Sequence, residues 1–272
     1  MGRILSTGLV CLALGTAGLV VHDTWFTRLQ LEYLTSDKIV RGRPLRVLQI
    51  ADFHSLPRNR QIDSIIDQAA AAKPDIVAIT GDLVTTRDSD YEAVNRLFAG
   101  LRATHNNIFV VWGNHDHWNT AYHGRNRLAE VLAKHHLVLL DDDSVSLDGP
   151  WGALDVIGTD DYYSADPDLN AALAGTRPEA FRLLLTHSPE AVPALRGSGV
   201  DLAVCGHTHG GQIRLPFIGA SYTPGIWFPK YVKGWYDIDG VPLYIDSGVG
   251  TSGPPVRAFN QSQITLLEIR HG

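Results

Sequence analysis

The chain has 272 residues, of which 44% are hydrophobic and 19% are charged, and these values exclude a disordered, collagen-like or coiled-coil protein. Its formal net charge is −6, whereas a general nucleic-acid-binding protein is normally basic, so we expect no nucleic acid as a partner. Two cysteines are too few for a disulfide framework. Histidine is unusually frequent, with 12 residues, and several of these histidines lie in short polar motifs.

Residues 1–21 are predicted to form a membrane anchor, because residues 4–21 are uncharged and mostly apolar. A helix of that length reaches about 27 Å, close to the ~30 Å hydrocarbon core of a bilayer. A cleaved signal peptide and an amphipathic core helix are the alternatives. An anchor predicts single-pass attachment to the cell inner membrane. Arg3 and Arg28 lie on opposite sides of the stretch, so the positive-inside rule gives no clear orientation. We favour the cytoplasmic face of the membrane for the catalytic domain.

Residues 22–44 are predicted to connect the anchor to one catalytic domain, residues 45–272. The first part of this domain alternates strands (45–51, 75–80, 108–112, 137–140) with helices (61–72, 89–103, 124–134). The later part is expected to contain mainly strands, at residues 145–147, 153–157, 181–186, 202–205, 231–238, 242–245 and 264–269. This order predicts an α/β fold with two sheets packed face to face and helices outside them.

Five short polar motifs come directly after predicted strands. They are Asp52-Phe53-His54, Gly81-Asp82, Gly113-Asn114-His115-Asp116, Thr186-His187-Ser188-Pro189 and Gly206-His207-Thr208-His209. Each motif alone is more often a turn, a cap or a surface feature. Because loops after the carboxyl ends of strands are where α/β folds bind ligands, the five motifs together predict one functional site.

The side chains of these motifs form a mixed set of oxygen and imidazole donors. Such a set suits Mn²⁺, Fe or Zn²⁺, whereas Mg²⁺ or Ca²⁺ alone prefers oxygen. Seven donors are too many for one ion and fit two ions about 3.5–4 Å apart that share a carboxylate. The candidate metal ligands are Asp52, His54, Asp82, Asn114, His187, His207 and His209.

The ordered series of motifs resembles the calcineurin-like metallophosphoesterase superfamily over residues 46–209. Residues 206–212, 231–234 and 248–250 are similar to its bacterial membrane-anchored branch, some members of which hydrolyse UDP-2,3-diacylglucosamine in lipid A biosynthesis. The resemblance implies a four-layer α/β/β/α sandwich, two divalent cations with Mn²⁺ foremost, and hydrolysis of a phosphoester or pyrophosphate.

The resemblance also implies a role for each residue of the motifs. Asp82 would bridge the two ions, and His115 would donate a proton to the leaving oxygen or stabilise charge on the phosphoryl group. Asp116 would orient His115. The first ion would be held by Asp52, His54 and His209, and the second by Asn114, His187 and His207.

Two sequence features bear on the substrate. Thr85 and Thr86 stand where many relatives have an acid and an arginine, and losing a bidentate phosphate clamp favours a diester or pyrophosphate over a monoester. Residues 216–236 contain seven aromatic residues and predict a loop that touches acyl chains or the membrane, with an aromatic minicore as the alternative. We therefore expect a membrane-associated nucleotide-lipid substrate such as UDP-2,3-diacylglucosamine. The alternatives are a general phosphodiesterase, a cell-envelope phosphatase, and a non-catalytic binding module.

Overall fold

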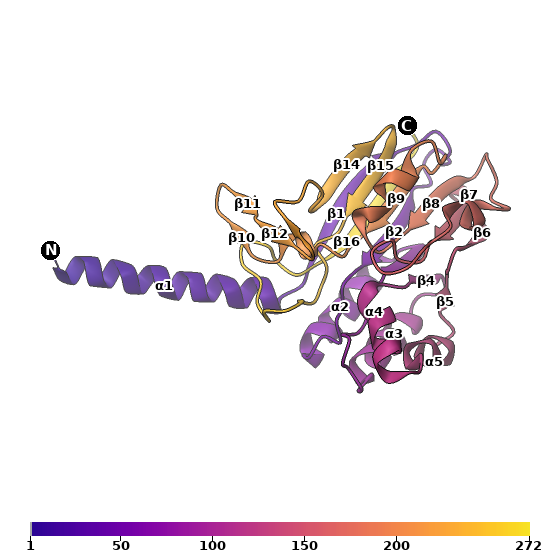
Figure 1. Ribbon diagram of the computed structural model, residues 1–272. Coiled ribbons are helices and arrows are strands. Elements are labelled where there is room, and N and C mark those ends of the chain that lie inside the picture. Colours follow the sequence, from indigo (N-terminus) through magenta and orange to yellow (C-terminus); the bar gives the residue numbers. More distant parts are fainter. Residues whose placement is uncertain (1) are drawn as a thin grey trace.

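Two six-stranded sheets form the centre of the computed structural model, which describes residues 2–272, with side chains described from Leu14 onward (Figure 1). The first sheet has the order β1 (Arg28–Thr35), β16 (Gln263–Arg270), β2 (Leu45–Ile50), β3 (Ile76–Thr80), β4 (Ile108–Val111), β5 (Val138–Leu139). The second has the order β14 (Gly234–Ile238), β15 (Val241–Ile245), β9 (Leu202–Cys205), β8 (Phe181–Leu185), β7 (Gly152–Gly158), β6 (Asp143–Gly149).

Three apolar clusters hold the layers together. Between the sheets, buried side chains such as Val47 and Phe109 meet Leu183 of the second sheet. Helices α2 (Asn59–Ala72) and α3 (Glu92–Arg102) cover the outer face of the first sheet with their apolar faces. The short helices α6 (Leu169–Leu173) and α7 (Val192–Leu195) cover the second sheet. The predicted α/β fold with two stacked sheets and outer helices is confirmed.

Strand β1 lies inside the segment that the sequence predicts to be a connector, residues 22–44. It pairs with β16 in parallel along its whole length, from Arg28 opposite Gln263 to Thr35 opposite Arg270. Its apolar residues Leu29 and Leu31 stay exposed on the outer face, while polar residues face inward. Residues 28–35 of the segment therefore form the edge strand of the first sheet, and the reversed alternation explains why no strand is predicted there.

The helix predicted at residues 124–134 corresponds to one helix of the structure, and a further helix that the sequence analysis did not predict precedes it. Helix α4 (Asn114–His123) begins within the third polar motif, and α5 (Arg127–Lys134) follows it. Gly124 ends α4 in a left-handed conformation with φ of 64°. Because α4 begins at Asn114, the Asn-His-Asp motif forms the first turn of a helix. The free backbone N–H groups of that turn are directed into the site.

Helix α1 (Gly2–Trp25) projects away from the two sheets (Figure 1). Its last turn is joined to the body, because Asp23 and Thr24 are buried. Among the residues that the structure describes, no helix combines the length and hydropathy that a membrane span requires. Residues 1–13 of the predicted anchor, residues 1–21, lie outside the described side chains.

Candidate metal centre

The five motifs meet at the carboxyl ends of β2, β3, β4, β8 and β9. The strands of each sheet that carry them run parallel, so their ends open at the same edge. Several of these residues adopt left-handed backbone conformations, with φ of 52° at Asp52, 53° at Asp82 and 50° at His209. Such conformations are sparsely populated for non-glycine residues and cluster at functional sites.

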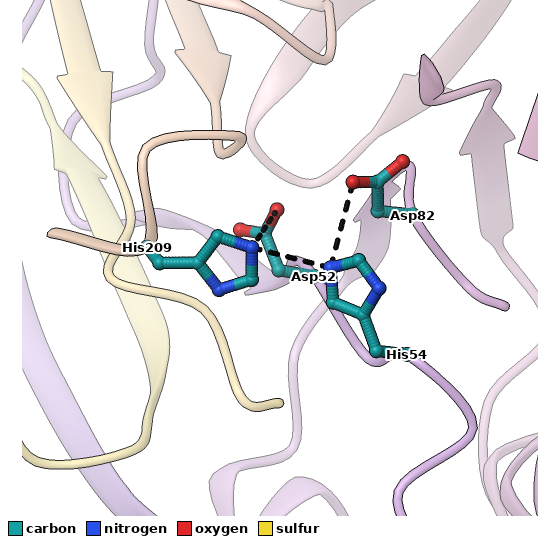
Figure 2. Close-up of side chains that lie close together, drawn as sticks. All are labelled: Asp52, His54, Asp82 and His209. Carbon is teal, nitrogen blue, oxygen red and sulfur yellow. Dashed lines mark hydrogen bonds and ion pairs between the residues drawn. The ribbon is translucent and has the colours of Figure 1, made fainter. Parts of the chain in front are cut away.

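The first group of donors contains Asp52, His54, Asp82 and His209, and Figure 2 shows their side chains turned toward one another. One ligand atom from each lies within 4.8 Å of the others. The Nε2 atoms of His54 and His209 are 3.2 Å apart, and His54 Nε2 is 3.5 Å from Asp82 Oδ2. All four residues are buried, so they form a compact cluster of donors.

The second group contains Asp82, His187 and His207. His187 Nε2 lies 3.4 Å from Asp82 Oδ2 and 3.2 Å from His207 Nδ1. Asn114 joins this group, because its Oδ1 is 3.1 Å from His187 Nε2. Asp82 Oδ2 is thus almost equally distant from an imidazole of each group, and Asp82 is the member that the groups share.

The chemistry of both groups fits divalent cations. Burial lowers the pKa of His54 and of His207 to about 4, so both imidazoles are neutral at pH 7, which is the form that binds a metal. Asp52 Oδ2 and His207 Nε2 are buried without a hydrogen-bond partner. Unpaired buried polar atoms are costly in a folded protein, and a bound ion satisfies them. The residues present can therefore hold two metal ions.

The orientation of Asp82 is fixed by the beginning of α4. The backbone N–H of His115 donates to Asp82 Oδ1 over 2.8 Å, which leaves Oδ2 for the imidazoles of both groups. Gly113 precedes this helix and lies so close that an added Cβ would be 2.4 Å from Asp82 Oδ1. A glycine is needed there because any side chain would displace the shared carboxylate.

His115 has a different partner from the one that the resemblance implies. Its Nδ1 is 3.1 Å from the hydroxyl oxygen of Thr86, and its ring meets the ring of His54 edge-on at 4.9 Å. Asp116 accepts backbone N–H groups from Leu83 and Val84 through Oδ1 and from Gly113 through Oδ2. The prediction that Asp116 orients His115 is therefore wrong: Asp116 ties two backbone loops together, and Thr86 holds the imidazole.

Two further residues of the site were missed at the sequence level. Asn260 Nδ2 donates to the backbone carbonyl of His209 over 2.7 Å, and Arg257 Nη1 donates to the same oxygen over 3.3 Å. Arg257 is fully buried and also donates to the carbonyls of Ser247 and Gly250. Neither residue lies in a recognisable motif, since each acts on backbone atoms brought close by the tertiary fold.

Two aromatic rings lie against histidines of the centre. The Trp118 ring lies 5.1 Å from that of His115, and the Tyr163 ring lies 4.7 Å from that of His207. Trp118 and Tyr163 also contact one another, with centroids 6.2 Å apart. Both are partly exposed, so they offer apolar surface to a ligand beside the two donor groups.

The aromatic segment 216–236 divides into two parts. Tyr231 and Tyr236 pack edge to face and join the apolar cluster behind the second sheet. Phe217, Trp227 and Phe228 are exposed, with 72% of Trp227 and 74% of Phe228 accessible. The minicore alternative therefore holds for the end of the segment, while its middle presents aromatic surface to the surroundings.

Comparison with known proteins gives relatives along most of the chain. The metallophosphoesterase Cj0846 of Campylobacter jejuni is 30% identical over 238 residues, which cover 84% of this chain and 60% of that protein. Phosphodiesterase YaeI of Escherichia coli is 28% identical over 230 residues, which cover 83% of this chain and 82% of that protein. The chain thus spans about three fifths of the length of the Campylobacter relative.

Solved structures include the same fold. TT1561 of Thermus thermophilus superimposes with a TM-score of 0.51 at 12% identity, covering 75% of this chain and 90% of that one. Residues 45–211, which contain all five motifs, match the sequence model of the calcineurin-like phosphoesterases. Because that match covers more than half of the chain, this protein belongs to the calcineurin-like phosphoesterase family.

Proposed function

We propose that this protein is a dinuclear-metal-dependent phosphodiesterase. The observation that carries the proposal is the shared carboxylate: Asp82 Oδ2 faces His54 in one donor group and His187 in the other, at 3.5 and 3.4 Å. Two ions that share a carboxylate form the clamp that metal-dependent phosphoryl transfer uses. The name of the relative YaeI, a phosphodiesterase, supports the same reaction class.

The residues have the following roles in this proposal. Asp52, His54 and His209 hold one ion, Asn114, His187 and His207 hold the other, and Asp82 belongs to both. When bound, the ions supply Lewis-acid chemistry and neutralise charge on the phosphoryl oxygens. Mn²⁺ is the ion that we propose, with Fe and Zn²⁺ as alternatives, since nitrogen and oxygen donors are mixed.

His115 is the proton donor to the leaving oxygen. It lies beside His54 at the edge of the first donor group, and its Nδ1 contacts Thr86, so Nε2 is the nitrogen left to face a substrate. A general acid in this position typically contributes about 10²–10⁴-fold to the rate. Thr86 stands where the motif of many phosphatases of the resembled superfamily has an arginine, and a diester, with less charge per phosphorus, needs that guanidinium less.

The finer part of the proposal is an amphipathic substrate at the cell inner membrane, such as the nucleotide-lipid UDP-2,3-diacylglucosamine. The apolar stretch 4–21 and the projecting α1 support a membrane attachment, with the catalytic domain on the cytoplasmic face. The exposed rings of Trp227 and Phe228 support contact with lipid, because aromatic side chains favour membrane interfaces.

The test is hydrolysis by purified full chain, first depleted of metal and then loaded with Mn²⁺, Mg²⁺ or Zn²⁺. The substrates are UDP-2,3-diacylglucosamine, bis(p-nitrophenyl) phosphate and p-nitrophenyl phosphate. We expect metal-dependent cleavage of the diester and the nucleotide-lipid. Preference for the monoester contradicts the diester assignment, and inactivity with every pair of metal and substrate favours a non-catalytic binding module.

A further inference from the structure

A cavity of about 490 Å³ adjoins the first donor group, with His209 as part of its wall. Its remaining lining is largely apolar and includes Ile213, Leu215, Tyr222, Pro224 and Pro254. The size lies within the range of small-molecule binding sites, about 300–1,000 Å³. A residue of the candidate metal centre thus also borders a space that suits an apolar group.

A second, smaller cavity of about 280 Å³ adjoins the first. His207 borders it, together with the charged residues Glu190 and Lys230. The two cavities share Thr208, Thr223 and Pro224 in their walls. One cavity bordered by His209 and a second bordered by His207 therefore lie beside the same pair of imidazoles.

We propose that the larger cavity binds an alkyl or acyl chain of the substrate while the phosphorus lies at the metal centre. This inference rests on the proposed phosphodiesterase function. The occupant is part of the substrate because His209 belongs both to the cavity and to the first donor group. A group bound in the cavity is thereby held next to the reacting phosphorus.

The exposed apolar residues of the cavity wall indicate how much binding free energy such a chain would gain. Ile213, Leu215 and Tyr222 are 41%, 45% and 46% accessible, which leaves apolar surface of all three in contact with water. Covering apolar surface stabilises a complex by roughly 25 cal/mol per Å², or about 0.8 kcal/mol for each buried CH₂. A chain that enters the cavity therefore raises affinity in proportion to its buried length.

A series of alkyl p-nitrophenyl phosphates with methyl, butyl and octyl chains tests this inference. Water attacks phosphorus, the P–O bond to nitrophenolate breaks, the leaving oxygen takes up a proton, and the alkyl phosphate remains. The Mn²⁺-loaded full chain is assayed below the micellar concentration of each ester. We expect kcat/KM to rise about fourfold for each methylene that enters the cavity, the ratio that 0.8 kcal/mol gives.

The outcomes separate this inference from the proposed function. Equal kcat/KM for the methyl and octyl esters overturns the chain-binding cavity and leaves the phosphodiesterase proposal standing. Absence of hydrolysis of every diester, the methyl ester included, overturns the proposed function and this inference with it.

A pair of matched variants locates the effect. Leu215→Asp places a charge in the cavity wall, and Leu31→Asp places one on the outer face of β1, where Leu31 is 44% accessible. We expect Leu215→Asp to lower the ratio of octyl to methyl kcat/KM toward one, and Leu31→Asp to keep the wild-type ratio. Ile213→Asp is the second cavity variant should Leu215→Asp fold poorly by circular dichroism. An equal loss of the ratio in cavity and control variants overturns the proposal.

Discussion

The side-chain amide of Asn260 donates a 2.7 Å hydrogen bond to the backbone carbonyl of His209. The backbone N–H of the same asparagine donates to Asp23 Oδ2, in the last turn of α1, over 3.1 Å. Asn260 thus links the projecting helix to a candidate metal ligand. His209 has a φ of 50°, a conformation of a kind that costs about 1–3 kcal/mol and persists only where neighbours enforce it.

Asn260→Ala is expected to weaken binding of Mn²⁺ to the first donor group. The substitution removes the shorter of the two hydrogen bonds to the carbonyl of His209 and leaves only the longer one from Arg257, so His209 is held less firmly. Loss of such an outer partner typically lowers metal affinity or activity by about 10–100-fold. Isothermal titration of the metal-depleted protein with Mn²⁺ measures the change.

Asn170→Ala serves as the control for that experiment, because Asn170 is exposed on α6, away from the two donor groups. We expect it to bind Mn²⁺ as the wild type does. If Asn260→Ala keeps the wild-type affinity, its bond to His209 does not position the ligand.

His115→Ala and Asp82→Ala are expected to separate proton donation from metal binding. His115→Ala should lower kcat by about 10²–10⁴-fold on a substrate with a poor leaving group and keep two metal ions per chain. Asp82→Ala should lose metal and activity together, since Asp82 belongs to both donor groups. Metal analysis beside steady-state kinetics tests both. Wild-type turnover in His115→Ala would show that another group protonates the leaving oxygen.

Thr86→Val is expected to lower kcat by up to roughly tenfold without loss of metal. Valine has a similar shape but lacks the hydroxyl that contacts His115 Nδ1, and a hydrogen bond of this kind contributes about 0.5–1.5 kcal/mol. Thr86→Ser restores the hydroxyl and should recover most of the activity. A merely structural role would instead lower the thermal stability of Thr86→Val and leave the pH profile of kcat unchanged.

Lys233 is expected to make the stability of the fold depend on pH between about 8 and 10.5. Burial lowers the pKa of Lys233 to about 8 from its ordinary 10.5, so the folded state binds fewer protons than the unfolded state in this interval. Stability therefore rises as pH increases from about 8 to 10.5, and this gain is lost as pH falls from 10.5 back to about 8. In Lys233→Met this contribution disappears.

The measurement is the difference in Tm between the wild type and Lys233→Met at pH 7.5 and at pH 10, both without metal. We expect the wild type to gain stability relative to the variant as pH rises. Lys230→Met is the control, because Lys230 is an exposed lysine of the same segment. Parallel pH curves for the wild type and Lys233→Met would refute the assignment.

The α/β alternation, the order of the five motifs and the set of donors could all be predicted from the amino-acid sequence. These features are local: apolar strands end where polar residues begin, and parallel strands bring their carboxyl ends together, so residues such as Asp52 and Asp82 were predictable neighbours. The family was predicted from the same motifs, and the match of residues 45–211 to the family model confirms it.

The residues that hold those donors in place became visible in the folded chain. Thr86 contacts His115 across 29 positions, and Asn260 reaches His209 across 51. Strand β1 was hidden because an edge strand with exposed leucines reverses the usual alternation. The cavity beside His209 combines residues near position 213 with Pro254. Contacts between distant segments leave no periodic signal in the sequence, since they depend on how the sheets and loops pack.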